Sequence, residues 1–252
     1  MGAAVLTLVM KTFVVQAFRI PSGSMEDTLQ IGDRVLVNKL SYRLHGVGRG
    51  DIVVFSGQGS WDPAAPPASG NPVTGTYHSV LRALGLETSG TDYIKRVIGL
   101  PGDHVACCKS GRVTVNGVPL TENSYLYPGN TPSVQPFSAT VPPDRLWVMG
   151  DHRGDSADSR YHTEDPGGGT IPESEVVGRA FVVIWPPSHL AQLPVPATFR
   201  QAALEAWGGA APALPALAGI ASAVPLLALG RRAGRRAMIG RRSRRRFRPA
   251  GS

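Results

Sequence analysis

The chain has 252 residues, enough for one sizeable hydrophobic core or for one domain with an appended subdomain. Its formal net charge of +8 comes from the C-terminus, because ten of the 26 basic residues lie between Arg231 and Arg248, leaving 16 against 18 acidic residues. A body of nearly balanced charge argues against a nucleic-acid-binding surface along the whole chain, and two Cys exclude a framework of several disulfides.

The first feature along the chain is an apolar segment at residues 2–18, which contains Lys11 and is followed by Arg19. Its length is at the lower limit for a membrane span, and a lysine within the span is unfavourable unless it reaches a polar partner. A cleaved secretory signal and a buried core helix are alternatives. No basic n-region precedes the run and no A-x-A-like site ends it. We therefore predict an uncleaved N-terminal membrane anchor over residues 1–20.

Two serines follow directly, in the sequence Pro21-Ser22-Gly23-Ser24-Met25. A glycine between two serines is typical of a tight turn that presents a hydroxyl group. The turn alone is a weak indication of function, because Ser and Gly are common in ordinary loops. Its position is more informative, since Ser24 would lie close to the membrane surface.

The middle of the chain has the pattern of a β protein, with short apolar or alternating runs separated by Gly and Pro. We expect strands at residues 31–40, 51–55, 93–98, 146–149 and 178–185. Val105 and residues 112–115 suggest a hairpin with Asn116-Gly117 as its turn. The irregular spacing favours a mostly β, coiled antiparallel-sheet domain over alternating βαβ units.

Two segments interrupt this pattern. Residues 56–92 begin with a Pro/Gly/Ser-rich loop, and residues 77–86 within them are expected to form a short helix. Residues 101–143 are expected to form a β-hairpin insert. The insert contains adjacent cysteines, Cys107 and Cys108, which are compatible either with two thiols or with a local bridge.

A serine nucleophile requires a base. The six His are in no recognisable triad pattern, and no G-x-S-x-G elbow is present. A neutral lysine is the other option, because burial in an apolar site can lower a lysine pKa by about 3–5 units. Lys95 alone lies within an apolar strand. The other lysines are in the anchor, at a strand end or beside the cysteines: Lys11, Lys39 and Lys109. A single strand lysine is usually an exposed edge charge, so both interpretations stay open.

A dense polar segment, GDHRGDSADSR, occupies residues 150–160. One interpretation is a cation-binding loop with Asp151, Asp155 and Asp158 as ligands, although the spacing does not match an EF-hand. A second is a solvated turn. A third is a hydrogen-bonded network in which Asp158 pairs with Arg160 and Ser156 bonds the lysine. We predict no metal and no cofactor.

The C-terminus carries a second candidate for a membrane span. Residues 206–230 are uncharged and rich in Ala and Leu, and an Arg-rich tail follows at residues 231–252. Three prolines favour the alternative of a disordered Ala/Pro-rich tail: Pro212, Pro215 and Pro225. An Arg cluster after an apolar run follows the positive-inside rule, and it also suits anionic lipid head groups. A nucleic-acid-binding tail is the rival explanation.

We therefore predict a second transmembrane helix at residues 206–230, preceded by a juxtamembrane linker at residues 189–205. The Arg-rich tail would be cytoplasmic and residues 21–188 would form an extracytoplasmic domain. The predicted fold is this mostly β domain with its β-rich insert, flanked by N-terminal and C-terminal transmembrane helices.

Four segments, taken in order, resemble bacterial type I signal peptidases: PSGSMEDTLQIGDRVLVNKL, GDIVVF, YIKRVIGLPGD and GDHRGDSADSR. They cover the chain from Pro21 to about Trp185, and the ordered set is far more specific than any one of them. The resemblance implies a mostly β serine protease with a Ser/Lys dyad. It also implies a place in the bacterial cytoplasmic membrane, the lipid bilayer as a partner, and the signal peptides of secretory pre-proteins as substrates.

The same resemblance implies the roles of individual residues. Ser24 would be the nucleophile and Lys95 the general base, while the Ser22 hydroxyl and the Ser24 backbone N–H would form the oxyanion hole. Ser156 would orient Lys95. The remaining implied residues support the site or pack beside it: Met25, Asp151, Asp158 and Arg160. The chain departs from the family at Asp27, where Pro is frequent, and at His152, where Asn is frequent, which affects only local loop geometry.

Three alternatives remain at this point. A non-catalytic membrane-tethered β-domain would be a relative that has lost its activity, yet both Ser24 and Lys95 are present. A self-cleaving Ser-Lys protease of the repressor type would need a DNA-binding region before Ser24, where this chain has an apolar segment. A nucleic-acid-binding role through the Arg-rich tail is the third, and we predict no nucleic-acid partner.

Overall fold

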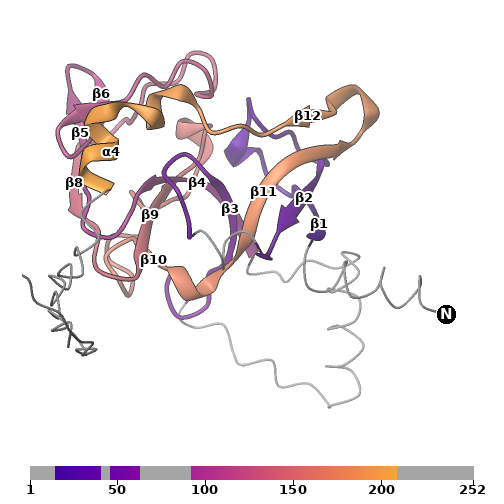
Figure 1. Cartoon of the computed structure of the whole chain (residues 1–252), viewed down its shortest axis with the longest axis horizontal. Helices are drawn as coiled ribbons and strands as arrows, with labels where there is room; N and C mark the ends of the chain where they lie inside the picture. The colour runs from indigo at the N-terminus through magenta and orange to yellow at the C-terminus, as the bar shows by residue number, and fades with distance from the viewer. Residues whose placement is uncertain (1–14, 41–45, 63–91, 209–252) are drawn as a thin grey trace, which may run out of the picture. The chain divides into compact units, whose positions relative to one another are not determined.

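A computed structural model describes residues 15–40, 46–62 and 92–208 of the chain (Figure 1). In these residues the fold is mostly β, as predicted, and is built from two antiparallel sheets with a few short helices. The predicted helix at residues 77–86 and the Arg-rich tail lie outside the described residues.

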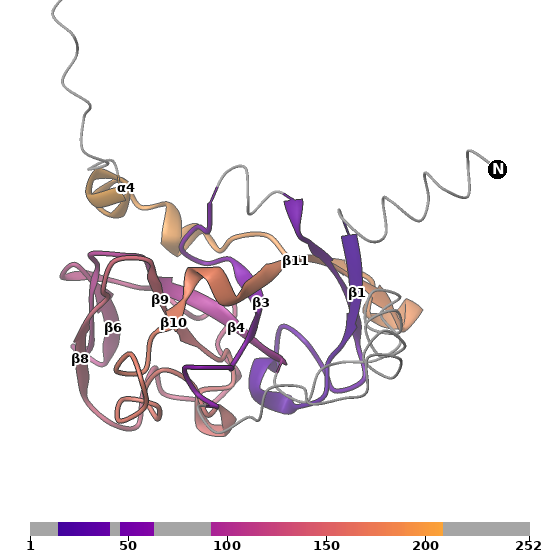
Figure 2. The same ribbon diagram turned by 90° about the horizontal axis from the view of Figure 1, so that it is seen from below.

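The larger sheet has the strand order β1-β2-β11-β3-β4-β9-β10, with β12 paired to β11. Every adjacent pair is antiparallel. Its strands are β1 (Val15–Arg19), β2 (Arg34–Asn38), β3 (Ile52–Ser56), β4 (Asp92–Gly99), β9 (Arg145–Met149), β10 (Ile171–Pro172), β11 (Val176–Trp185) and β12 (Ala191–Gln192). Figure 1 shows the long β11 crossing between β2 and β3, and Figure 2 shows β1 as an outer strand.

The smaller sheet has the order β7-β6-β5-β8 and lies within residues 101–143, where a hairpin insert was expected. Its strands are β5 (His104–Lys109), β6 (Arg112–Val115), β7 (Val118–Pro119) and β8 (Phe137–Thr140). The predicted turn was wrong, because β5 and β6 are joined at Ser110-Gly111, whereas Asn116-Gly117 joins β6 to β7. All four turn residues have positive φ, so both dipeptides suit a two-residue hairpin turn.

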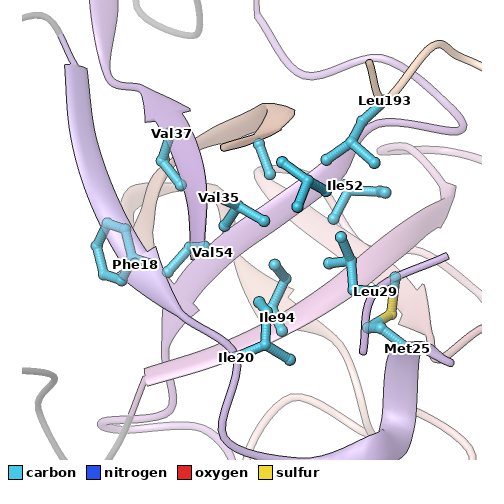
Figure 3. Close-up of a cluster of buried hydrophobic side chains, with 12 residues drawn as sticks. Phe18, Ile20, Met25, Leu29, Val35, Val37, Ile52, Val54, Ile94 and Leu193 are labelled. Carbon is cyan, nitrogen blue, oxygen red and sulfur yellow. The ribbon is translucent and has the colours of Figure 1, made fainter. Parts of the chain in front are cut away.

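Alternation of buried and exposed side chains along β2 explains how this strand contributes to the first core cluster. In β2, Val35 and Val37 are fully buried while Arg34 is exposed, as the sequence pattern predicted. Figure 3 shows how this cluster joins strands far apart in the chain. Its labelled members are Phe18, Ile20, Met25, Leu29, Val35, Val37, Ile52, Val54, Ile94 and Leu193.

Residues 15–19 correct the predicted N-terminal anchor. They form β1, which pairs with β2 over its whole length, and Phe18 is buried in the first core cluster. The end of the predicted anchor was therefore wrong, because an apolar run alone does not distinguish a strand from the end of a helix. Residues 1–14 lie outside the described part of the chain. Within that part, no helix has the length and hydropathy to span a membrane.

Residues 189–205 correct a second prediction, the juxtamembrane linker. They contain β12, a 3-10 turn at Ala197–Arg200 and most of helix α4 (Ala202–Gly208). Three of their apolar side chains are buried, Leu193, Phe199 and Leu204, and the Leu193 N–H donates to the Phe181 carbonyl at 2.9 Å. The folded domain therefore continues beyond residue 188. The buried side chains are irregularly spaced among prolines, so no periodicity revealed them.

If residues 189–205 belong to the domain, Leu204→Ala should lower the free energy of unfolding by about 2–5 kcal/mol, the usual cost of a cavity at a buried leucine. Urea unfolding measures this change. The matched control is Leu190→Ala, whose side chain is 62 % exposed and should change stability by less than about 0.5 kcal/mol. Equal effects of the two substitutions would contradict the assignment.

Candidate active site

The turn that carries Ser24 is a 3-10 turn, Gly23–Met25, between β1 and β2. Backbone hydrogen bonds close it at its base, with Ile20 N–H donating to Asp33 O and Leu29 N–H donating to Met25 O. Met25 and Leu29 are fully buried in the first core cluster (Figure 3). Ile20, which precedes Ser24, is buried in the same cluster, so buried apolar residues on both sides fix the position of the Ser24 hydroxyl group.

Ser24 meets Lys95, which lies 71 residues further along the chain. Lys95 Nζ is 2.7 Å from Ser24 Oγ, within hydrogen-bonding distance. Both residues are buried, with Lys95 only 4 % exposed. When the amine is protonated it donates to the hydroxyl, and when it is neutral it can accept the hydroxyl proton. A hydroxyl within hydrogen-bonding distance of an amine is the geometry that transfer of the hydroxyl proton to a base requires.

The position of Lys95 in the sheet explains its burial. It lies in β4, between β3 and β9, in register with Val53. Tyr93 and Val97 lie on the same strand face as Lys95 and pack in one cluster with Val53. Ile94 lies on the opposite face and packs in the first core cluster. Burial lowers the pKa of Lys95 from 10.5 to about 8, although the carboxylates of Asp158, Asp151 and Asp155 oppose the shift. The alternative interpretation of Lys95, as an exposed charge at the edge of a sheet, is thus excluded.

The polar loop 150–160 lies beside this pair. The predicted ion pair is confirmed, because Arg160 Nε and a terminal nitrogen bind the two Asp158 oxygens, each at 2.8 Å. The Gly150 N–H also donates to Asp158 at 2.9 Å. The His152 N–H donates to the Ser24 carbonyl at 3.1 Å, which joins the loop directly to the Ser24 backbone.

Asp151 has a partner that the sequence reasoning missed. Arg96 binds it through two hydrogen bonds of 2.8 and 2.6 Å, and both side chains are buried. Thr28 Oγ1 also donates to Asp151. The sequence does carry a signal for this residue, since Arg96 is a second charged side chain beside Lys95 in an apolar strand. Guanidinium groups bind both Asp151 and Asp158. These contacts argue against the interpretation of the loop as a cation-binding site.

A second buried ion pair was also missed. Arg153 binds Glu122 from the insert, and the Tyr125 hydroxyl donates to Glu122 Oε1 at 2.8 Å. Arg96 lies over the Tyr125 ring, 4.5 Å from its centre. No local pattern could have identified Glu122, because its partner lies 31 residues away in another part of the fold.

Ser22 and Ser156 have weaker contacts with the pair of Ser24 and Lys95. Ser22 is exposed, and its Oγ is 3.5 Å from Ser24 Oγ. Ser156 is buried, but its Oγ makes no hydrogen bond to any described residue. The hydrogen bond to Lys95 that the sequence reasoning expected is therefore not formed. Ser156 nevertheless lies close by, since a Cβ added at Gly150 would collide with both Ser156 and the Ser24 carbonyl.

Three other positions noted in the sequence are now placed. The His152 ring stacks on Tyr127 with 4.0 Å between ring centres, and its Nδ1 is 3.5 Å from a Glu26 oxygen. Asp27 is exposed beside the serine turn. Cys107 and Cys108 form a local disulfide bond.

A buried serine hydroxyl beside a partly neutral amine is the arrangement that a serine protease with a lysine base requires. A family model described as "Signal peptidase, peptidase S26" matches residues 1–185. The chain belongs to this family. Its activity is that of a type I signal peptidase, a serine endopeptidase, which decides against a non-catalytic domain and a self-cleaving repressor-type protease.

Named relatives agree with this family. Signal peptidase I of Mycobacterium tuberculosis is 42% identical over 208 residues, covering 74% of this chain and 70% of that protein. The probable signal peptidase I of Mycobacterium leprae is 41% identical over 212 residues, covering 73% of each protein. A solved signal peptidase I from Enterococcus faecalis is 24% identical with a TM-score of 0.33, covering 53% of this chain and 95% of that chain.

The buried amine should reduce stability at neutral pH, so Lys95→Met should raise the free energy of unfolding at pH 7 by about 1–3 kcal/mol. The folded-state pKa of about 8 is below the usual 10.5, so the unfolded state binds more protons between these values. The cost is therefore complete below pH 8 and disappears as the pH approaches 10.5. Urea unfolding at pH 7 and pH 10 measures it, and a Lys95→Met protein without a stability gain at pH 7 would contradict it.

Proposed function

We propose that Ser24 is the nucleophile and Lys95 the general base in the cleavage of signal peptides from secretory pre-proteins. One observation carries the proposal: the Lys95 amine is 2.7 Å from the Ser24 hydroxyl oxygen in a buried site. With the ordinary lysine pKa of about 10.4, roughly one amine in a few thousand is neutral at pH 7. With the pKa at about 8, roughly one in ten is neutral.

The reaction follows from these positions. Ser24 Oγ attacks the carbonyl carbon of the scissile bond while Lys95 Nζ accepts the hydroxyl proton. The Ser24 backbone N–H and the Ser22 hydroxyl stabilise the tetrahedral oxyanion. Lys95 then gives the proton to the leaving amine, an acyl-enzyme remains on Ser24, and Lys95 activates the water that hydrolyses it.

The supporting residues act through position and charge. Asp158 and Asp151 are each held by a guanidinium group, and their carboxylates keep the Lys95 pKa from falling further. Ser156 is proposed to orient the amine. Its buried hydroxyl has no hydrogen-bond partner among the described residues, which is unfavourable unless a polar group reaches it during the reaction.

The substrate and the membrane arrangement complete the proposal. The substrates would carry small residues at the cleavage site, as in A-x-A. The apolar residues before β1 and those within 206–230 would anchor the chain in a bacterial cytoplasmic membrane, with the catalytic domain outside. The arginines from Arg231 to Arg248 would remain cytoplasmic and contact anionic lipid head groups.

Ser24→Ala and Lys95→Ala should each abolish cleavage of a pre-protein, because one lacks the attacking oxygen and the other the proton acceptor. Ser22→Ala should lower kcat by about 10²–10³, the usual cost of one oxyanion donor. Cleavage assays in detergent or lipid measure these effects. The control is Ser138→Ala, which changes an exposed serine in the insert and should leave cleavage unaltered. Activity in Ser24→Ala or Lys95→Ala would refute the proposal.

The pH dependence should identify the base. Because only the neutral amine can accept the proton, kcat/KM should rise with pH and level off above a midpoint of about 8. A profile of cleavage rate against pH from 6 to 10 measures this midpoint. A midpoint close to 6.5 would instead indicate a histidine base.

A further inference from the structure

Residues 122–135, which lie within the connection between β7 and β8, pack against the polar loop 150–160. We call this segment the strap. The Tyr127 N–H donates to the Asp151 carbonyl at 3.1 Å, and the Gly154 N–H donates to the Asn130 side chain at 2.6 Å. The Gln135 side-chain amide donates to the Arg160 carbonyl at 3.1 Å. The strap thus holds the loop near its beginning, its middle and its end.

The strongest contact between strap and loop is the ion pair of Glu122 and Arg153. Both residues are buried, with exposed fractions of 3 % and 1 %. The Arg153 guanidinium binds both carboxylate oxygens and also donates to the Pro132 carbonyl at 2.6 Å. Its Nε donates to the Gly150 carbonyl at 2.9 Å. Arg153 therefore connects the Glu122 charge to the first residue of the loop.

From Gly150 the connection to the nucleophile is short. The backbone of Gly150 packs against the Ser24 carbonyl so tightly that no Cβ would fit there. Two residues further on, the His152 N–H bonds the same carbonyl. A displacement of the loop would therefore move the Ser24 backbone, whose N–H is one of the two oxyanion donors.

The buried charge of Arg153 explains why Glu122 is needed. A guanidinium removed from water is stable only when a carboxylate compensates it, and deleting one partner leaves an unpaired charge. Without Glu122, Arg153 would turn towards water or towards another carboxylate, and its bond to Gly150 would be lost.

We propose that Glu122 is a positioning residue for signal-peptide cleavage, which holds the loop 150–160 against Ser24 through Arg153. This inference rests on the proposed roles of Ser24 and Lys95. It concerns the alignment of the reacting groups and not the binding of substrate. A change at Glu122 should therefore lower kcat with little effect on KM.

The test compares Glu122→Gln with Asp103→Asn in the full-length enzyme. Asp103 is also 3 % exposed and also holds an arginine, Arg49, through two hydrogen bonds of 2.7 and 2.6 Å. Its other side-chain bonds go to Leu100 and Asn116, outside the loop 150–160. Both substitutions should lower Tm. Only Glu122→Gln should lower kcat, by about 10- to 100-fold, with KM changed by less than about twofold.

A double-mutant cycle tests the route through Arg153. Because Glu122 acts through Arg153, the Glu122→Gln/Arg153→Met enzyme should have the kcat of Arg153→Met alone, within about twofold. Independent, multiplying effects on kcat would overturn the inference. So would equal values of kcat in Glu122→Gln and Asp103→Asn.

A milder variant covers the case in which Glu122→Gln does not fold. Asn130→Ala removes one hydrogen bond at a partly exposed residue of the strap, so it should fold and lower kcat by about two- to tenfold. An unchanged kcat would overturn the inference. An active Ser24→Ala enzyme would instead refute the proposed nucleophile. An inactive Ser24→Ala with a normal Glu122→Gln would refute only the role of Glu122.

Discussion

An amine buried beside a hydroxyl group is the feature on which the rest of this structure depends. Burial raises the free energy of the charged lysine, and the central position of β4 between β3 and β9 provides that burial. Three nearby carboxylates act in the opposite direction, the strongest being Asp158. The result is a pKa of about 8, close enough to neutral pH for the amine to accept a proton without an extreme cost to stability.

The buried charges around the amine are paired, which explains why the site tolerates so many ionisable groups. Arg96 binds Asp151, Arg153 binds Glu122, and Arg160 binds Asp158, all in buried positions. Each pair satisfies hydrogen bonds that would be costly to leave open, and each adds no net charge near Lys95. Paired guanidinium groups can thus hold the loop 150–160 without displacing the lysine from its partly neutral state.

The insert, residues 101–143, and residues 189–205 pack together in one core cluster. Phe199 and Leu204 belong to the same cluster as Tyr125, and the Tyr125 and Phe199 rings stack with 5.9 Å between their centres. The Thr121 N–H donates to Thr198 Oγ1 at 2.7 Å. The family match ends at residue 185, but packing continues beyond it. These residues support the start of the strap, next to Glu122.

Local patterns in the sequence were enough to identify most strands of the large sheet and the segments that carry Ser24 and Lys95. The alternation around Val35 and the apolar surroundings of Lys95 depend only on neighbours in the chain, so they are readable without a fold. The pairing of Asp158 with Arg160 was also accessible, because the two residues are separated by one position. The family resemblance supplied the roles of Ser24 and Lys95, which remain proposals.

Tertiary structure alone decided which distant groups meet. Residues 15–19 are a strand because β2 was available to pair with them, although their composition suited a membrane helix equally well. Leu204 is buried because the insert offers it an apolar surface. Arg96 and Arg153 found carboxylates 55 and 31 residues away. A sequence pattern contains only the neighbours of a residue along the chain. Burial and ion pairing depend on the tertiary contacts that the residue makes in the folded chain.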